Sequence, residues 1–181
     1  MIQQRNTALH AAETTVFPDL VDLNRLSDQA FGDALALLFE PAPQFAARLA
    51  AERPFASDAA LLGAATRVAR EMPEDEQVEL VNAHPRLGAG GALSAQSRRE
   101  QGAADASVDT ELLRLNQAYE ARFGFRYLVF VAGRHRRALI PEFQAGLARE
   151  RSAELRRALG DTCAIAAARL DRFRRTPREI P

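Results

Sequence analysis

Apolar residues recur at intervals of three and four along most of this chain, which is the spacing of one face of an α-helix. Phe31, Leu35 and Leu38 form the first clear stripe, and Ser27 just before them is a favourable N-cap. We therefore expect regular order to begin at Ser27. By the same signals, later helices are expected to begin at Pro43, Ser57, Pro73 and Thr110, another to carry Ile140, Phe143 and Leu147, and the last to run from Ser152 to about Arg175.

One run departs from helical spacing. Residues Phe125 to Val131 are mostly aromatic or β-branched, a composition typical of a strand. No second such run exists to pair with it, and a lone strand would leave its backbone groups without partners. We therefore predict an irregular extended segment near 125–131, buried against helices. The predicted fold class is all-α, a compact single-domain multi-helix bundle over residues 21–176 that follows a flexible N-terminal arm at 1–20.

The composition indicates one domain and argues against nucleic acid or a membrane as partners. The chain has 181 residues, 47% of them hydrophobic, which suffices for one domain with a real core. Its formal net charge is +0, so no overall field favours nucleic acid or an anionic membrane. The single cysteine, Cys163, excludes an intrachain disulfide, and no apolar run is long enough to span a bilayer. Because the termini carry neither a secretory leader nor a peroxisomal address, we expect a cytoplasmic protein.

Chemistry is expected in the polar stretch that interrupts the helices between residues 82 and 101. His84 lies between a helix end and Pro85, which restrains its backbone. An imidazole with a pKa of about 6.5 can exchange a proton at neutral pH, but a histidine here can equally cap the carbonyls of its own helix. Glu100 is also ambiguous. It has capping-box spacing with Ser97, yet its carboxylate can instead face a pocket beside an imidazole.

Arg169 is the charged member of a mostly apolar stripe on the last predicted helix. Its guanidinium either reaches solvent past a packed stem or points at an anion inside a pocket. The other histidines, His10 and His135, lie in polar segments that require no function of them. The glycines at 88, 90 and 91 lack the flanking signals of a nucleotide-binding loop, and no metal-ligand spacing occurs in the chain.

Several motifs together resemble the OHCU decarboxylase family, which converts 2-oxo-4-hydroxy-4-carboxy-5-ureidoimidazoline (OHCU) to (S)-allantoin in urate breakdown. The motifs are Arg53-Pro54-Phe55, His84-Pro85-Arg86-Leu87-Gly88, Ser97-Arg98-Arg99-Glu100-Gln101, the run Leu115 to Phe125, and Arg169-Leu170. They follow one order over roughly residues 23 to 173. Two positions depart from the common family pattern, since Arg86 replaces an acid and Arg126 follows Phe-Gly-Phe.

The resemblance implies a carboxy-lyase that needs no metal or organic cofactor, acts on a small ureidoimidazoline and usually forms a homodimer. It implies His84 as the general acid/base and Glu100 as the carboxylate that orients the substrate and assists proton transfer. The substrate-binding residues that it implies are Pro85, Ser97, Gln101, Phe125, Leu128, Val129 and Arg169. Among these, Arg169 would grip an anionic or carbonyl oxygen, and backbone groups of Phe125 to Val129 would bind the ureido part.

Two other functions stay open. The fold can have lost catalysis and serve as a helical interaction module associated with the ureide pathway. Alternatively, Ser97 can be the nucleophile of a hydrolase, provided that it lies within hydrogen-bond reach of His84. Geometry separates these possibilities. In an enzyme of the first kind His84, Glu100 and Arg169 converge on one pocket, whereas an Arg169 that points to solvent would argue against it.

Overall fold

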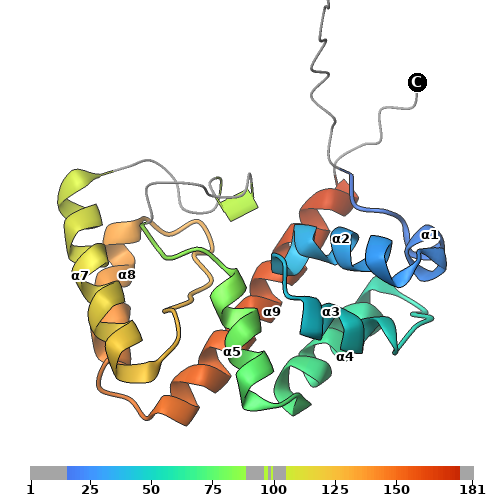
Figure 1. Ribbon diagram of the computed structural model, residues 1–181. Coiled ribbons are helices and arrows are strands. Elements are labelled where there is room, and N and C mark those ends of the chain that lie inside the picture. The colour runs from blue at the N-terminus through green and yellow to red at the C-terminus, as the bar shows by residue number, and fades with distance from the viewer. Residues whose placement is uncertain (1–15, 89–95, 98, 100–104, 176–181) are drawn as a thin grey trace, which may run out of the picture.

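A long C-terminal helix organises the structure, a computed structural model that describes residues 16–88, 96, 97, 99 and 105–175. This helix, α9 (Arg151–Arg175), crosses the middle of the molecule and packs against α2, α4 and α5 (Figure 1). The other helices are α1 (Leu20–Arg25), α2 (Asp28–Phe39), α3 (Pro43–Ala50), α4 (Asp58–Glu71), α5 (Glu74–Ala83), α7 (Ala106–Phe123) and α8 (Arg136–Gly146). The described residues contain no strand, which confirms the all-α fold class.

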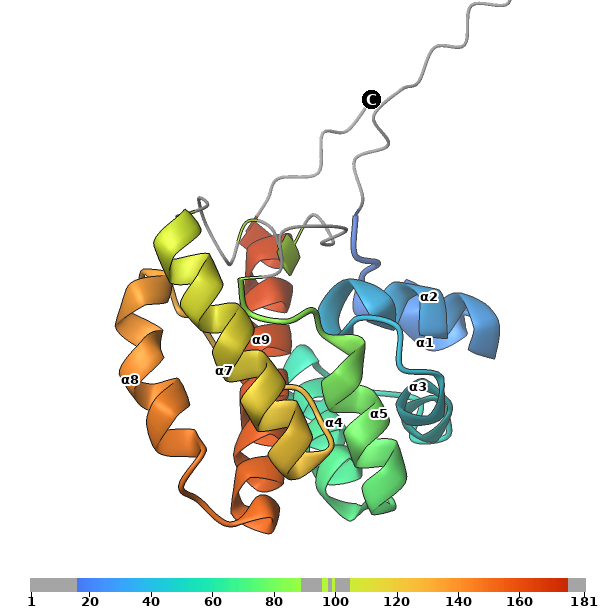
Figure 2. The ribbon, with the colours of Figure 1, turned by 60° about the vertical axis from the view of Figure 1, so that its left-hand side comes forward.

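The helices form two groups on either side of α9. Helices α1 to α4 lie on one side and the parallel pair α7 and α8 on the other, with α5 beside α9 between them (Figures 1 and 2). Apolar side chains from both groups form one continuous buried core. None of the helices in the described ranges is long and apolar enough to cross a membrane.

Most of the predicted helix starts are confirmed, two of them by side-chain capping contacts. Ser27 Oγ accepts a hydrogen bond from the amide of Ala30 at 3.3 Å, and Ser57 Oγ accepts one from Ala60 at 3.0 Å. The predicted start at Thr110 is wrong, because α7 begins at Ala106 and is capped by Asp105. Thr110 lies inside the helix, where its hydroxyl donates to the Ala106 carbonyl at 2.9 Å.

Order begins earlier than Ser27, contrary to the prediction. Helix α1 starts after Asp19, whose carboxylate accepts from the amide of Asp22 at 2.9 Å. Just before it Phe17 is buried, with its ring centroid 6.0 Å from that of Phe173 on α9. A single aromatic residue produces no periodicity, so the sequence pattern did not reveal this contact. The arm stays a prediction for residues 1–15, which lie outside the described ranges.

The segment between α7 and α8 is extended, as predicted, and side chains take the place of a partner strand. Gly124 ends α7 in the left-handed conformation, with φ 77°. The amide of Arg126 then donates to Asn82 Oδ1 at 2.9 Å, and Arg157 Nη1 of α9 donates to the Leu128 carbonyl at 2.8 Å. These bonds satisfy backbone groups that a sheet would otherwise pair, so a lone extended run is stable here.

Aromatic packing fixes the same segment from its other side. Tyr127 stacks on Phe143 of α8 with ring centroids 3.7 Å apart, and Tyr119 of α7 meets both rings edge-on. The Tyr119 hydroxyl donates to the fully buried carboxylate of Glu154 at 2.6 Å. Arg157 also donates to Glu154. Burial alone would raise the pKa of the Glu154 carboxyl, but the hydrogen bonds from Arg157 and Tyr119 hold that pKa below its ordinary value. The extended segment is therefore held in place by contacts on both of its sides.

Candidate functional site

His84 follows the last residue of α5, where its backbone leaves the helix. Its conformation is extended, with φ −75° and ψ 143°, as the following Pro85 requires. Arg126 reaches across from the extended segment and donates Nη1 to the carbonyls of Asn82 and His84, at 2.5 and 2.9 Å. These bonds satisfy carbonyls at the end of α5, so the backbone of His84 is fixed from two directions.

The side chain of His84 caps its own helix through one ring nitrogen and leaves the other directed elsewhere. Nδ1 lies 3.3 Å from the carbonyl oxygen of Leu80, one turn back on α5. Because a carbonyl only accepts, Nδ1 carries the proton of the neutral ring. Nε2 is then the basic nitrogen, and it is buried with no hydrogen-bond partner among the described residues. The capping bond therefore selects the tautomer that leaves a base at Nε2.

Burial keeps this imidazole neutral. His84 is 2% exposed, and desolvation lowers its pKa to about 4, well below the ordinary 6.5. The positive charge of Arg169 lowers the pKa further, whereas the carboxylate of Glu40 and the bond to Leu80 oppose the shift. At neutral pH the ring is therefore uncharged, and Nε2 carries a lone pair that can accept a hydrogen bond.

A cavity of about 330 Å³ lies against His84. Its walls come from the end of α5, from the extended segment after Tyr127, from the C-terminal half of α9 and from Ser97 and Arg99. The volume suits a small molecule of one ring with short substituents. The lining combines apolar residues with three arginines, Arg99, Arg169 and Arg172.

Arg169 points inward, which excludes the alternative in which its guanidinium reaches solvent. It is 1% exposed, and its guanidinium donates Nη1 to the Leu38 carbonyl at 3.2 Å. Nη2 donates to Glu40 Oε1 at 3.0 Å and to Ser97 Oγ at 3.2 Å. Ser97 Oγ in turn donates to the same Glu40 oxygen at 2.8 Å. A buried acid, alcohol and guanidinium thus form one cluster beside His84.

The structure brings most of the predicted site residues together. The cavity is lined by His84, Pro85, Ser97, Leu128, Val129 and Arg169. Phe125 does not belong to it and lines a separate hollow with Asn82, Arg86, Glu120, Gly124 and Arg126. Phe125 precedes the point where the extended segment reaches the cavity, and its ring packs against Tyr119 instead. Glu100 and Gln101 lie outside the described residues.

Sequence reasoning missed Glu40, together with the lining residues Tyr127, Arg99 and Arg172. For Glu40 a signal existed, because an acid at the C-terminal end of a helix opposes the helix dipole. The hydrolase hypothesis loses support from the same cluster. The hydroxyl proton of Ser97 is donated to Glu40 and is not directed at His84.

Arg86 and Arg126, the two residues that depart from the family pattern, both border the separate hollow. Arg86 pairs with Glu120 through two bonds of 2.6 and 2.7 Å, and both residues border the separate hollow together with Arg126. Arg86 therefore does not line the cavity that contains His84. The position at which Arg86 replaces an acid therefore lies outside the cavity lining.

Comparison with known proteins identifies the family. The profile of the OHCU decarboxylase family matches residues 24–171. The 2-oxo-4-hydroxy-4-carboxy-5-ureidoimidazoline decarboxylase of Haloferax volcanii is 32% identical over 160 residues, which cover 85% of this chain and 95% of the relative. The chain belongs to the OHCU decarboxylase family. The OHCU decarboxylase fold is also found in a solved structure, that of an OHCU decarboxylase in the presence of (S)-allantoin. It matches with a TM-score of 0.66 at 18% identity, over 82% of this chain and 99% of that one.

Some OHCU decarboxylase relatives are longer. The uric acid degradation bifunctional protein PucL of Bacillus subtilis is 34% identical over 154 residues, which are 82% of this chain but only 31% of that protein. The similarity is therefore confined to one part of the bifunctional chain.

Proposed function

We propose that this protein decarboxylates OHCU to (S)-allantoin in urate breakdown, as a cofactor-independent carboxy-lyase. The observation that carries the proposal is the geometry of His84. This buried, neutral imidazole lines a cavity of suitable size, and its Nε2 atom has no hydrogen-bond partner among the described residues. Its family supplies the substrate class, because the relatives named above are OHCU decarboxylases.

The chemistry asks little of the protein beyond orientation, desolvation and control of protons. In OHCU the carboxylate is bonded to a ring carbon adjacent to an imine. When that carbon–carbon bond breaks, CO2 leaves and the electron pair moves onto the imine nitrogen. A proton then adds to the ring carbon that becomes the stereocentre of allantoin. A buried cavity favours the first step, because removal from water destabilises the charged carboxylate more than it destabilises neutral CO2.

His84 is proposed as the general acid/base. With Nδ1 fixed on the Leu80 carbonyl, Nε2 accepts the hydrogen bond of the substrate hydroxyl that neighbours the carboxylate. After CO2 has left, transfer of that hydroxyl proton to Nε2 forms the ring carbonyl while the neighbouring ring carbon takes up the proton that makes it the stereocentre. Pro85 sets the angle of the ring by fixing the backbone that carries it.

The other contacts are proposed on their position in the cavity wall. Arg169 provides the positive charge toward an anionic or carbonyl oxygen of the substrate, and Ser97 binds a polar edge of the ring. Backbone groups at Leu128 and Val129 bind the ureido part, whereas Phe125 is left out because it lies away from the cavity. Glu100 and Gln101 keep their proposed roles in proton transfer and ring binding. A homodimer and a cytoplasmic location also stay predictions.

The experiment generates OHCU in situ from urate, with urate oxidase and the preceding hydrolase, and follows its disappearance in the ultraviolet. We expect the wild-type protein to accelerate the loss of OHCU, and His84→Ala to abolish the acceleration while the circular-dichroism spectrum stays helical. His135→Ala, which removes an exposed histidine that does not line the cavity, is the matched control and should keep full activity.

A wild-type protein that leaves the spontaneous rate unchanged would support the inactive interaction module instead. Normal turnover by a folded His84→Ala protein would refute the proposed role of the histidine.

A further inference from the structure

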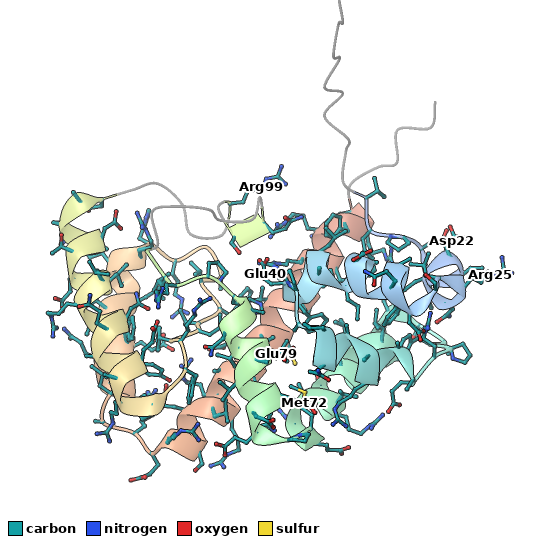
Figure 3. The ribbon with its side chains drawn as sticks, viewed as in Figure 1. Asp22, Arg25, Glu40, Met72, Glu79 and Arg99 are labelled. Carbon is teal, nitrogen blue, oxygen red and sulfur yellow. The ribbon has the colours of Figure 1, made fainter. Side chains whose placement is uncertain are left out.

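A buried carboxylate stands behind the proposed site without a role in the chemistry above. Glu40 follows the last residue of α2, is 8% exposed and is absent from the lining of the cavity. Figure 3 shows its side chain at the end of α2 that faces α9, below the short segment that carries Arg99. Its oxygen Oε1 accepts from two residues that do line the cavity, Ser97 at 2.8 Å and Arg169 at 3.0 Å.

The position of Glu40 is unfavourable on two local counts. Its backbone has φ 60° and ψ 170°, a region that residues with a side chain rarely occupy. It also places a negative charge at the C-terminal end of a helix, where the dipole disfavours it. Neither feature helps α2 to end, because the prolines at 41 and 43 already stop the helix. The compensation therefore comes from what the carboxylate contacts.

Those contacts join parts of the chain that are remote in sequence. Arg169 is 129 residues from Glu40 and Ser97 is 57 residues from it. The adjacent Leu38 carbonyl accepts from the same guanidinium at 3.2 Å, so the end of α2 holds Arg169 at two points. An arginine bound at both terminal nitrogens has one orientation, and the hydroxyl of Ser97 is oriented with it.

The carboxylate also sets the charge beside His84. Within the described part of the chain, the charged groups around that ring are Arg169 and Arg172 of α9, Arg99, Glu40 at the end of α2, and Arg126 on the main-chain carbonyl of the histidine. The guanidinium of Arg169 lowers the pKa of His84, and the carboxylate of Glu40 raises it. Glu40 thus offsets the arginine that would otherwise make the imidazole a weaker base.

We propose that Glu40 is a positioning residue of the decarboxylase site, which acts through Arg169 and Ser97 and does not touch the substrate. It holds the guanidinium and the hydroxyl at the cavity wall and balances the charge next to His84. This inference rests on the proposed function, because it assigns Glu40 to the same reaction.

The test compares Glu40→Gln with Glu40→Asp in the OHCU assay. Glutamine keeps the length and an acceptor oxygen but removes the charge, whereas aspartate keeps the charge on a side chain one methylene shorter. Glu79→Gln is the matched control, since Glu79 also ties two helices by accepting from the amide of Gln44 at 3.2 Å but does not line the cavity. Each protein is checked for its helical circular-dichroism spectrum before kinetics.

We expect Glu40→Gln to lower kcat/KM by about tenfold or more, mostly through kcat, because charge-assisted hydrogen bonds are lost next to the reacting groups. The acid limb of its kcat/KM profile should move to lower pH, since the carboxylate that raises the pKa of His84 is gone. Glu40→Asp should lower kcat and leave the acid limb in place. Glu79→Gln should match the wild type in both.

A folded Glu40→Gln protein with wild-type kcat, KM and acid limb overturns the inference. If glutamine prevents folding, a folded Glu40→Asp protein with wild-type kinetics overturns it equally, and loss of the fold in both variants makes Glu40 a structural residue instead. Failure of the proposed function looks different, because the wild-type protein itself would then not accelerate the loss of OHCU.

Discussion

The burial of His84 has a consequence for stability that can be measured without substrate. In the folded protein its pKa is about 4, whereas in the unfolded chain it is the ordinary 6.5. Between these values the unfolded chain binds a proton at His84 and the folded chain does not, so acid favours unfolding. The part of the free energy of unfolding that depends on a neutral His84 is fully present above about pH 6.5 and is lost as the pH falls to about 4. A difference of about 2.5 pKa units corresponds to roughly 3 kcal/mol.

The assay is urea unfolding followed by circular dichroism, between pH 7 and pH 4.5, for the wild type and for His84→Gln. Carboxylates titrate in both proteins, so the difference between the two curves isolates the histidine. We expect the free energy of unfolding of the wild type to fall by about 2 kcal/mol more than that of the variant over this range. His135→Gln is the control, because this exposed ring is in water in both states. Parallel curves for wild type and His84→Gln would refute a buried, neutral His84.

Three further predictions follow from single contacts. Arg126→Ala removes the donor to two carbonyls at the end of α5 and should lower kcat several-fold with little change in KM, as steady-state kinetics would show. Arg169→Met removes the buried ion pair with the carboxylate of Glu40 and should lower the free energy of unfolding by roughly 3–5 kcal/mol in urea titrations. Gly88→Ala should lower it by about 1–3 kcal/mol in the same titrations, because φ is 78° and a Cβ would lie 2.8 Å from Leu112 Cδ1. Wild-type kcat in the first variant, or wild-type stability in the others, would contradict the contact concerned.

Much of the fold followed from local signals in the sequence. Ser27, Ser57 and Pro73 start helices where their capping chemistry predicts, and the extended run after Gly124 was recognisable by its composition. Thr110 misled because threonine is also tolerated within a helix, where its hydroxyl bonds the carbonyl four residues back. Local chemistry of this kind predicts where an element is allowed to start, and tertiary packing decides between the candidates.

The site was only partly predictable for the same reason. His84 could be found from its place at a helix end before proline, and its two possible roles prove compatible because one ring nitrogen serves each. Glu40 could not be linked to it, since the pairing with Arg169 spans 129 positions and has no sequence spacing of its own. Arg169 was ambiguous from its helix alone, because the stripe fixes which face carries the guanidinium but not what lies opposite.

The enantiomeric composition of the product tests the central claim most directly. OHCU is generated in situ from urate with and without the protein, and the allantoin formed is followed by circular dichroism until the substrate is consumed. A chiral cavity that delivers one proton to one face predicts an excess of (S)-allantoin with the wild-type protein, and a racemic product with His84→Ala or without protein. Racemic allantoin at the spontaneous rate in the presence of folded wild-type protein would contradict the proposed decarboxylase.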